Sequence, residues 1–335
     1  MAIRLRSLVP DSFVLMLAGA IVIATVIPVG AGALRIAGII STAAIVLLFF
    51  FHGLRLSREA VVAGLLRWRL HLAILGFGYL LFPLGGLALM PLSAAWLSPM
   101  LVLGLLFLGV LPTTVQSSIA YTSIARGNVA AAVVAAAASN IAGVVLTPLL
   151  FAAFAEVGGG EVDLSSIVKI ATMLLLPFTL GQIARIWLAE WIERWRSVTA
   201  RLDRLTIVLA VYVAFAQAAQ GGLWQQIGGT ELAILGGLVI LLMLIVFAGA
   251  WGFGRALGFD RGDRTTLLFC GGQKSLATGA PMARVLFPGP EAAAMLLPLI
   301  LYHQFQLIFS AFIAPRLAKN AAEAEENVAV EAAAE

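Results

Sequence analysis

The feature that most constrains this chain is a series of long apolar runs, separated by short segments that hold most of its charged residues. A helix needs about 20 mostly apolar residues to cross a bilayer, and about ten runs of that length follow one another. Charged residues make up 11% of the chain, whereas soluble domains carry about 25%. The pattern predicts an all-α membrane protein. The expected spans are 12–29, 34–52, 70–90, 96–125, 129–153, 165–186, 204–220, 231–254, 265–287 and 292–312.

The basic residues indicate how the chain is threaded through the membrane. Most of the 21 Lys and Arg residues fall in the loops on the side of the N-terminus, as cytoplasmic loops do. Only Arg35, Lys169 and Arg284 fall on the outer side, where the acidic segment 156–164 also lies. We therefore expect ten spans in the inner or plasma membrane, with both termini in the cytoplasm. Because topology accounts for the basic residues, we expect no nucleic-acid partner.

Several function classes are excluded by what the spans lack. Cys270 is the single cysteine, so neither an internal disulfide nor a multi-cysteine metal site can form. The three histidines are too far apart in the sequence to show metal-ligand spacing. No pair of acids lies deep in the spans, as an intramembrane enzyme would need, and no phosphate-binding loop of an ATP-driven pump appears. We therefore expect neither an enzyme nor a bound cofactor.

The span count divides the chain into two halves. Residues 1–160 would form a first five-helix repeat and residues 161–316 a second one. Because five is an odd number, the second repeat would be inserted upside down relative to the first. The cytoplasmic tail 317–335 is rich in alanine and glutamate, and we expect it to be a frayed helix or a disordered end.

The fourth span of each half is interrupted. The first interruption lies at Pro112, and the second, GGQKS, holds Lys274 near mid-depth. A lysine there costs about 2.5–3.5 kcal/mol on insertion scales and usually marks a site; the alternative is a lysine snorkelling from a misplaced helix end. Paired interruptions indicate a transporter site at the repeat interface. The polar candidates for substrate or ion binding are Thr113, Thr114, Gln116, Ser117, Ser118, Gln273, Lys274 and Ser275.

At these residues the chain resembles the bile acid:sodium symporter superfamily, in its SBF-like branch related to the cation–proton antiporters. The resemblance implies two inverted repeats interleaved into a panel and a core domain. It also implies that discontinuous fourth and ninth helices cross at the midplane, with substrate and ions bound beside the crossing. The motifs that carry it are FFFHGLRLS (49–57), RWRLHL (67–72), LPTTVQSSIA (111–120), ARGN (125–128), LTPLLF (146–151), GGQKSLATGAPMA (271–283) and LYHQFQL (301–307).

The sodium-binding positions implied by the resemblance are only partly retained. Where sodium-coupled relatives place an acid and an asparagine, this chain has Phe269 and Lys274, and a second hydroxyl position is Gly143. This pattern argues against sodium coupling, although Na⁺ and H⁺ both stay open as coupling ions. No confident metal site follows. The retained sodium-type positions are Ser117, Ser118, Ser139 and Gln273.

Lys274 offers two mechanisms in place of sodium. Its ammonium would bind the carbonyl end of the half-helix 265–271, where a sodium ion would otherwise lie, and its charge would favour an anionic substrate. Alternatively, Lys274 would exchange a proton during transport. In both cases we expect Lys274 to serve function rather than folding, so that Lys274→Met folds normally. Asn140 and His303, the latter near Gln306, are further candidates for the cavity lining.

The sequence thus predicts a secondary active transporter that moves a small organic anion or an ion by alternating access. Its partners would be that solute and the lipid bilayer, and a homodimer stays open. Two alternatives remain at this point. One is a carrier of the cation/proton antiporter type, and the other is a regulatory membrane protein that keeps the fold without transport.

Overall fold

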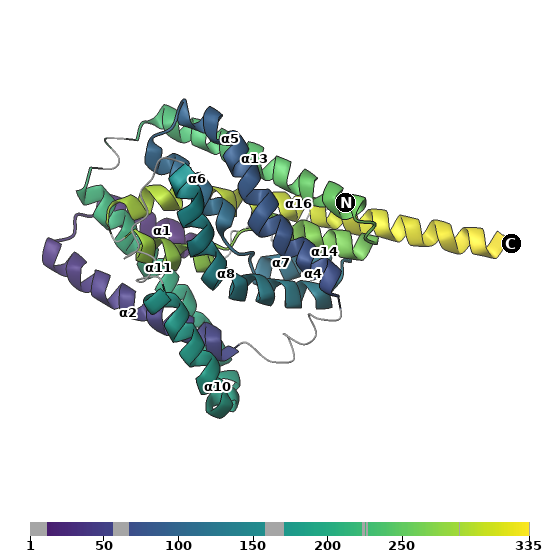
Figure 1. The fold of residues 1–335 in the computed structure, drawn as a ribbon, viewed down its shortest axis with the longest axis horizontal. Coiled ribbons are helices and arrows are strands. Elements are labelled where there is room, and N and C mark those ends of the chain that lie inside the picture. Colours follow the sequence, from purple (N-terminus) through teal and green to yellow (C-terminus); the bar gives the residue numbers. More distant parts are fainter. Residues whose placement is uncertain are drawn as a thin grey trace. The chain divides into compact units, whose positions relative to one another are not determined.

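The computed structural model describes residues 12–55, 67–157, 171–222, 225, 227–287 and 289–334, and every regular element in these ranges is helical (Figure 1). Seven of the described helical segments are long and apolar enough to cross a membrane. The chain is therefore a multi-pass membrane protein. The seven segments are Ala31–Arg55, Trp68–Ala94, Val129–Phe154, Thr172–Arg194, Arg196–Gln220, Gly229–Ala256 and Glu291–Glu323.

The chain folds into two compact units, and each unit takes segments from both halves of the sequence. Unit 1 consists of Met1–Leu56, Asp163–Gly229 and Gly279–Leu296. Unit 2 consists of Ser57–Val162, Thr230–Thr278 and Leu297–Glu335.

Unit 1 is built around two helices that cross at glycines. Gly53 lies in α2 and Gly181 in α10, and a Cβ atom added at Gly53 would overlap the carbonyl oxygen of Phe178. A Cβ at Gly181 would likewise overlap the carbonyl oxygen of Phe50. Small residues of this kind allow membrane helices to approach closely. The helices of this unit are α1 (Ser12–Val26), α2 (Ala31–Arg55), the π-helical turn η3 (Ala171–Leu175), α10 (Leu176–Arg194), α11 (Arg196–Gln220), most of α15 (Leu276–Leu286) and the start of α16 (Glu291–Ala334).

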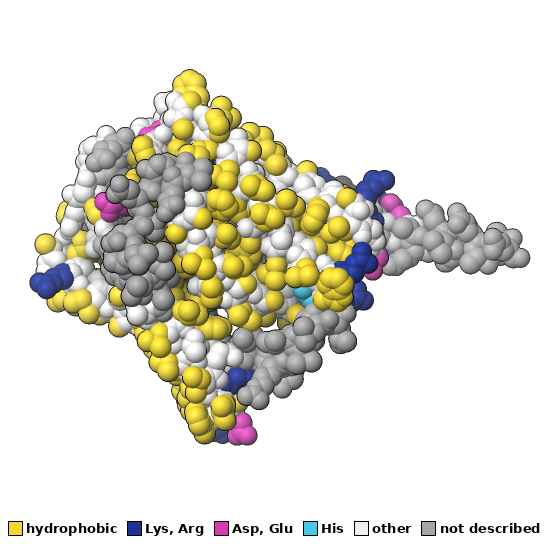
Figure 2. Space-filling view, in the orientation of Figure 1, with side chains coloured by type: hydrophobic (Ala, Val, Ile, Leu, Met, Phe, Trp, Pro, Cys, Tyr) yellow, Lys and Arg dark blue, Asp and Glu magenta, His cyan; other side chains and the backbone are white. Residues whose placement is uncertain are grey.

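Unit 2 contains both interrupted segments. Its helices are α4 (Trp68–Gly76), the π-helical turn η2 (Phe77–Leu81), α5 (Phe82–Ala94), α6 (Pro99–Val110), α7 (Gln116–Ile124), α8 (Val129–Val157), α13 (Gly229–Ala256), α14 (Arg261–Gly272) and most of α16 (Glu291–Ala334). The first turn of α15 (Leu276–Leu286) also belongs to it. Figure 2 shows hydrophobic side chains spread over the visible surface around α5, α8 and α13, as a lipid-facing surface requires.

The start of α14 is fixed to the start of α8 by a polar network. Asp260 caps α14 by accepting the Asp263 N–H at 2.8 Å. The Asp263 carboxylate accepts hydrogen bonds of 2.8 Å from both the Arg67 guanidinium and the Asn128 amide. Because Asp263 is 8% exposed, its charge needs these donors. The network holds the helix that leads into the second interruption.

Most of the predicted spans coincide with helices, and the two interruptions fall between α6 and α7 and between α14 and α15. In the tail 317–335, for which a frayed helix or a disordered end was expected, α16 continues without a break through Ala334. Alanine and glutamate favour helices, and a tail that extends an existing helix avoids the cost of nucleation. The repeat boundary at 160–161, Lys169 and most of the acidic segment 156–164 lie outside the described residues.

Candidate functional site

The two interruptions in unit 2 are bonded to each other through their backbones. The Ser275 N–H, between α14 and α15, donates to the carbonyl oxygen of Pro112, between α6 and α7, at 2.9 Å. Leu111 and Gln273, the first residues after α6 and α14, are both extended. A broken helix frees backbone groups that must find partners away from water. Here each interruption supplies a partner for the other.

Lys274 lies in the second interruption, between α14 and α15, and is 1% exposed. Its Nζ donates to three carbonyl oxygens, of Gly109 at 2.6 Å, Leu111 at 2.7 Å and Gly78 at 2.8 Å. It also lies 4.2 Å from the centroid of the Phe82 ring. An ammonium has three N–H donors, so every donor has an acceptor. The buried charge is stabilised by backbone dipoles and an aromatic face rather than by a carboxylate.

The position of this ammonium differs from the sequence-based prediction. We expected it at the carbonyl end of 265–271, but two of its acceptors, Gly109 and Leu111, lie at the end of α6. The carbonyl oxygen of Gly272, at the end of α14, instead accepts the Tyr302 hydroxyl at 2.6 Å. The four-carbon stem of Lys274 therefore brings its Nζ to the end of α6, whose last carbonyls have no partner within the helix.

Gln306 in α16 binds the backbone of Lys274. Its Oε1 accepts the Lys274 N–H at 2.8 Å, and its Nε2 donates to the Lys274 carbonyl oxygen at 2.9 Å. Gln306 Nε2 also lies 2.9 Å from Nδ1 of His303. Because an amide nitrogen can only donate, His303 Nδ1 accepts this bond, and the proton of the neutral imidazole is on Nε2 of His303. Gln306 is fully buried and His303 is 9% exposed. The predicted residue His303 is thus linked to the second interruption through Gln306.

A first polar group, the Gln273 cluster, joins four side chains: Thr114, Ser117, Gln273 and Ser310. The hydroxyls of Thr114 and Ser117 both donate to Gln273 Oε1 at 2.7 Å. Gln273 Nε2 donates to the Ser310 hydroxyl at 3.0 Å. The cluster therefore ties α7 and α16 to the second interruption, and it brings three of the predicted site residues together.

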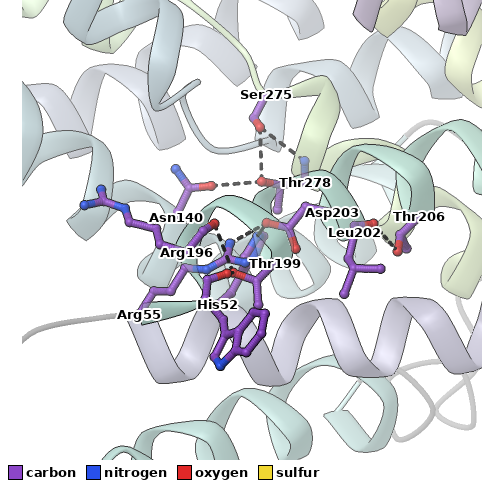
Figure 3. A network of polar contacts seen from close by, with 11 residues as sticks. His52, Arg55, Asn140, Arg196, Thr199, Leu202, Asp203, Thr206, Ser275 and Thr278 are labelled. Atoms are coloured by element: carbon purple, nitrogen blue, oxygen red, sulfur yellow. Dashed lines mark hydrogen bonds and ion pairs between the residues drawn. The ribbon is translucent and has the colours of Figure 1, made fainter. Parts of the chain in front are cut away.

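A second group, the Asn140 cluster, consists of Thr113, Ser139, Asn140, Ser275 and Thr278. The Ser139 hydroxyl accepts the Thr113 N–H at 3.1 Å, and Asn140 Nδ2 donates to the Thr113 carbonyl oxygen at 3.0 Å. Thr278 donates to Asn140 Oδ1 at 2.9 Å and lies 3.1 Å from the Ser275 hydroxyl, as Figure 3 shows. The Thr113 hydroxyl is buried and has no protein partner within the described ranges.

Unit 1 has its own polar group, also drawn in Figure 3, in which Arg55 at the end of α2 forms an ion pair with Asp203 of α11. His52 Nε2 lies 3.8 Å from the same carboxylate. None of the predicted site residues belongs to this group. Its partly buried charges link two helices of unit 1, which is a structural role.

Comparison with known proteins identifies the family. A model of the SBF-like CPA transporter family matches residues 11–319. This chain belongs to the SBF-like CPA transporter family. The chain is 44% identical over 318 residues to the uncharacterized protein PA2026 of Pseudomonas aeruginosa, covering 92% of this chain and 93% of the relative. It is 40% identical over 307 residues to the Escherichia coli protein named "Putative symporter YfeH", covering 91% and 92%.

A more distant relative is sodium/bile acid cotransporter 7 of Rattus norvegicus, which is 27% identical over 281 residues, or 83% of each chain. The family and the two relatives with functional names are transporters rather than enzymes. As a member of the SBF-like family, this chain is a membrane transporter, which implies a transported solute and a surrounding lipid bilayer.

The sodium-type positions of this family member do not form one set of ligands. Ser117 and Gln273 meet in the Gln273 cluster, but Ser139 lies in the Asn140 cluster. The Ser118 hydroxyl donates to the carbonyl oxygens of Thr114 and Val115, just before its own helix begins. Gln116 is exposed. No group of His, Cys, Asp or Glu that could hold a metal ion occurs within the described ranges.

Position 143 matches one of the hydroxyl positions of sodium-coupled relatives, but here it is a glycine. Tyr79 and Pro112 occupy the space that a side chain at position 143 would need. The Tyr79 hydroxyl donates to the Ser139 carbonyl oxygen at 2.6 Å. A Cβ atom at Gly143 would lie 2.6 Å from this hydroxyl and 2.9 Å from Cβ of Pro112. Sequence reasoning missed Tyr79, Thr278 and Ser310. Only Thr278 carried a signal, because it lies three residues from Ser275 and so on the same helical face.

Gly143→Ala is expected to lower the melting temperature of the purified protein. Overpacking costs about 1–3 kcal/mol, which corresponds to several degrees in a domain of this size. Gly76→Ala is the matched control, since a Cβ at Gly76 meets nothing within 4 Å. Equal melting temperatures of the two variants in a detergent thermal-shift assay would contradict the packing of Tyr79 and Pro112 against Gly143.

Proposed function

We propose that this chain is a secondary active transporter that carries a small organic anion across the inner membrane by alternating access, with Lys274 in the place of a coupling sodium ion. The observation that carries the proposal is the ammonium bound to three backbone carbonyls at the crossing of the two interruptions. Carbonyl oxygens are the hard ligands that a sodium ion would use. A tethered ammonium supplies the same positive charge to the same acceptors.

The charge balance of unit 2 supports an anionic solute. The described carboxylates of this unit lie at helix termini or in the tail: Glu231, Asp260, Asp263 and Glu323. None of them forms an ion pair with Lys274. All three N–H groups of Lys274 are taken by carbonyls, so the lysine acts on the solute through its field rather than by direct contact. In a medium of low dielectric constant such a field is strong.

Two groups are proposed to contact the solute directly. The Thr113 hydroxyl is buried without a protein partner. His303 is held by Gln306 through Nδ1, which leaves the N–H at Nε2 as a donor. Asn140 lies beside Thr113 and orients it. The Gln273 cluster, whose amide bonds to three hydroxyl groups, would instead hold the two interruptions in register.

For the architecture, we propose ten helices in two inverted repeats of five, with both termini in the cytoplasm. The α6–α7 and α14–α15 pairs would be the discontinuous fourth and ninth helices, crossing at the midplane. The bond between Ser275 and Pro112 supports this arrangement, as does the composition of each unit from both sequence halves. The distribution of basic residues supports the orientation.

Transport by the purified protein in liposomes tests the proposal. A thermal-shift screen of organic anions first identifies a ligand, because a ligand that binds only the folded state raises its melting temperature. We then expect uptake of that anion to be unchanged when choline replaces sodium on both sides. An uptake that rises with an imposed pH gradient would assign proton coupling. A requirement for sodium would refute the role of Lys274 as a built-in cation.

A further inference from the structure

Two Lys or Arg side chains are buried among the residues that the structure describes, and they are bonded very differently. Lys274 has a carbonyl oxygen for each of its N–H groups. Arg284 is 8% exposed, yet within the part of the chain that the structure describes it makes one hydrogen bond, from Nη1 to Oε1 of Gln217 at 2.6 Å. Its Nε is buried without a partner. The guanidinium therefore has a buried N–H donor, at Nε, that no acceptor uses.

The surroundings of Arg284 within unit 1 supply no described counter-charge. Arg284 lies in the last turn of α15, and Gln217 lies in α11. Of the carboxylates described in this unit, Asp203 pairs with Arg55 and Glu193 with Arg196. No ion pair joins Arg284 to them or to Glu190 or Glu291, the other two.

The free-energy cost of removing a guanidinium from water exceeds the stabilisation from one hydrogen bond to a neutral amide, unless a counter-ion is present. The carbonyl end of α15 offsets part of this cost, since basic groups are favourable at helix C-termini. It leaves the Nε–H unpaired, however, and an unpaired buried donor is unfavourable in itself. A carboxylate would supply both the missing counter-charge and an acceptor for the Nε–H, because it can accept two parallel N–H bonds from one guanidinium.

We propose that Arg284 is an anion-binding residue on the outer side of the transporter, where it takes the carboxylate of the incoming solute. Gln217 holds the guanidinium in place until the carboxylate arrives. The outer location follows from the charge distribution of the sequence. This inference rests on the proposed transport of an organic anion and adds the residue that recognises its charge. An arginine suits this task better than a lysine because its planar fork matches a carboxylate.

Benzoate is the probe for a first test on the full-length protein, with the neutral amide benzamide as its partner at equal ionic strength. We expect benzoate, as its choline salt, to raise the melting temperature by roughly 3 °C or more, and benzamide to have no effect. Arg284→Gln should abolish the benzoate shift. Arg35→Gln, which removes an exposed arginine of α2 on the same predicted side, should retain it. A shift that survives Arg284→Gln, or no shift in the wild type, would overturn the inference.

Gln217→Glu is a second variant that does not depend on the folding of Arg284→Gln. It gives Arg284 an internal carboxylate, so the unliganded protein should melt at a higher temperature while the benzoate shift disappears. Gln220→Glu is its matched control, because it adds the same charge at an exposed position three residues further along α11. If Gln217→Glu kept the full benzoate response, Arg284 would not be the binding residue.

The outcomes separate this inference from the proposed function. Liposome uptake of an organic anion that is insensitive to Arg284→Gln and Gln217→Glu would refute the inference and leave the transport function standing. A benzoate shift that depends on Arg284, together with no uptake of any anion that binds, would refute the transport function and leave the site standing.

Discussion

Lys274→Met is expected to yield a protein that unfolds at a markedly lower temperature than the wild type. The substitution leaves the carbonyl oxygens of Gly78, Gly109 and Leu111 without their donor. Three buried unsatisfied carbonyls cost roughly 3–9 kcal/mol in total, whereas removal of the mid-membrane ammonium returns about 2.5–3.5 kcal/mol. Over most of these estimates, the cost of the unsatisfied carbonyls exceeds the gain from removing the ammonium. The expected outcome therefore differs from the sequence-based expectation that Lys274→Met folds normally.

The melting temperature in detergent, with retention of the folded peak on size-exclusion chromatography, measures this effect. Lys319→Met is the control, since Lys319 is exposed and forms only an i,i+4 pair with Glu323. Lys274→Ala adds a direct test, because the space of the lost side chain can admit methylammonium beside the three carbonyls. Methylammonium, but not the bulkier tetramethylammonium, should then restore part of the lost stability. A Lys274→Met protein as stable as the wild type would show that the carbonyls find other partners.

Gly53→Ala is expected to disrupt unit 1 almost as strongly. The added methyl group would overlap the carbonyl oxygen of Phe178, which is backbone and cannot rotate away. The helices α2 and α10 must then separate, which costs about 3 kcal/mol or more. Gly181→Ala should act in the same way through the Phe50 carbonyl.

Gly38→Ala, on the same helix α2, is the matched control, since a Cβ at Gly38 meets nothing within 4 Å. Alanine is the better helix former by about 0.5–1 kcal/mol, so this variant should be neutral or more stable. Thermal melts of all three glycine variants decide the matter. If Gly53→Ala matched Gly38→Ala, the close crossing of α2 and α10 would be wrong.

Much of the fold was accessible from the sequence because apolar length and helix breakers act locally. The run of apolar residues at 231–254 predicts α13 almost to its ends, and Pro112 predicts a break where one occurs. The structure of the tail 317–335 was harder to predict, because its charged residues favour exposure to solvent while its alanine and glutamate residues favour a helix. Its continuation in α16 depends on the helix that precedes it.

The site was accessible in part, for a different physical reason. Sequence patterns identify which polar residues lie near a break, so Thr114, Ser117 and Gln273 were predicted together and do form one cluster. They do not reveal which distant carbonyl a long side chain reaches. The acceptors of Lys274 lie 163 to 196 residues away in the chain. Backbone carbonyls also carry no sequence signature, so the true partners of Lys274 could not be read from residue types.

The covalent attachment of the Lys274 ammonium also bears on how salt acts on this protein. An ion that binds only the folded state stabilises it by an amount that grows with the logarithm of the ion concentration. A tethered ammonium has no free concentration, so Gly78, Gly109 and Leu111 keep their donor at any salinity. We therefore expect the contribution of these three contacts to the free energy of unfolding to be independent of the sodium concentration. Under the proposed role of Lys274, a cell that makes this chain needs no sodium around it to keep the segments at Pro112 and Ser275 joined.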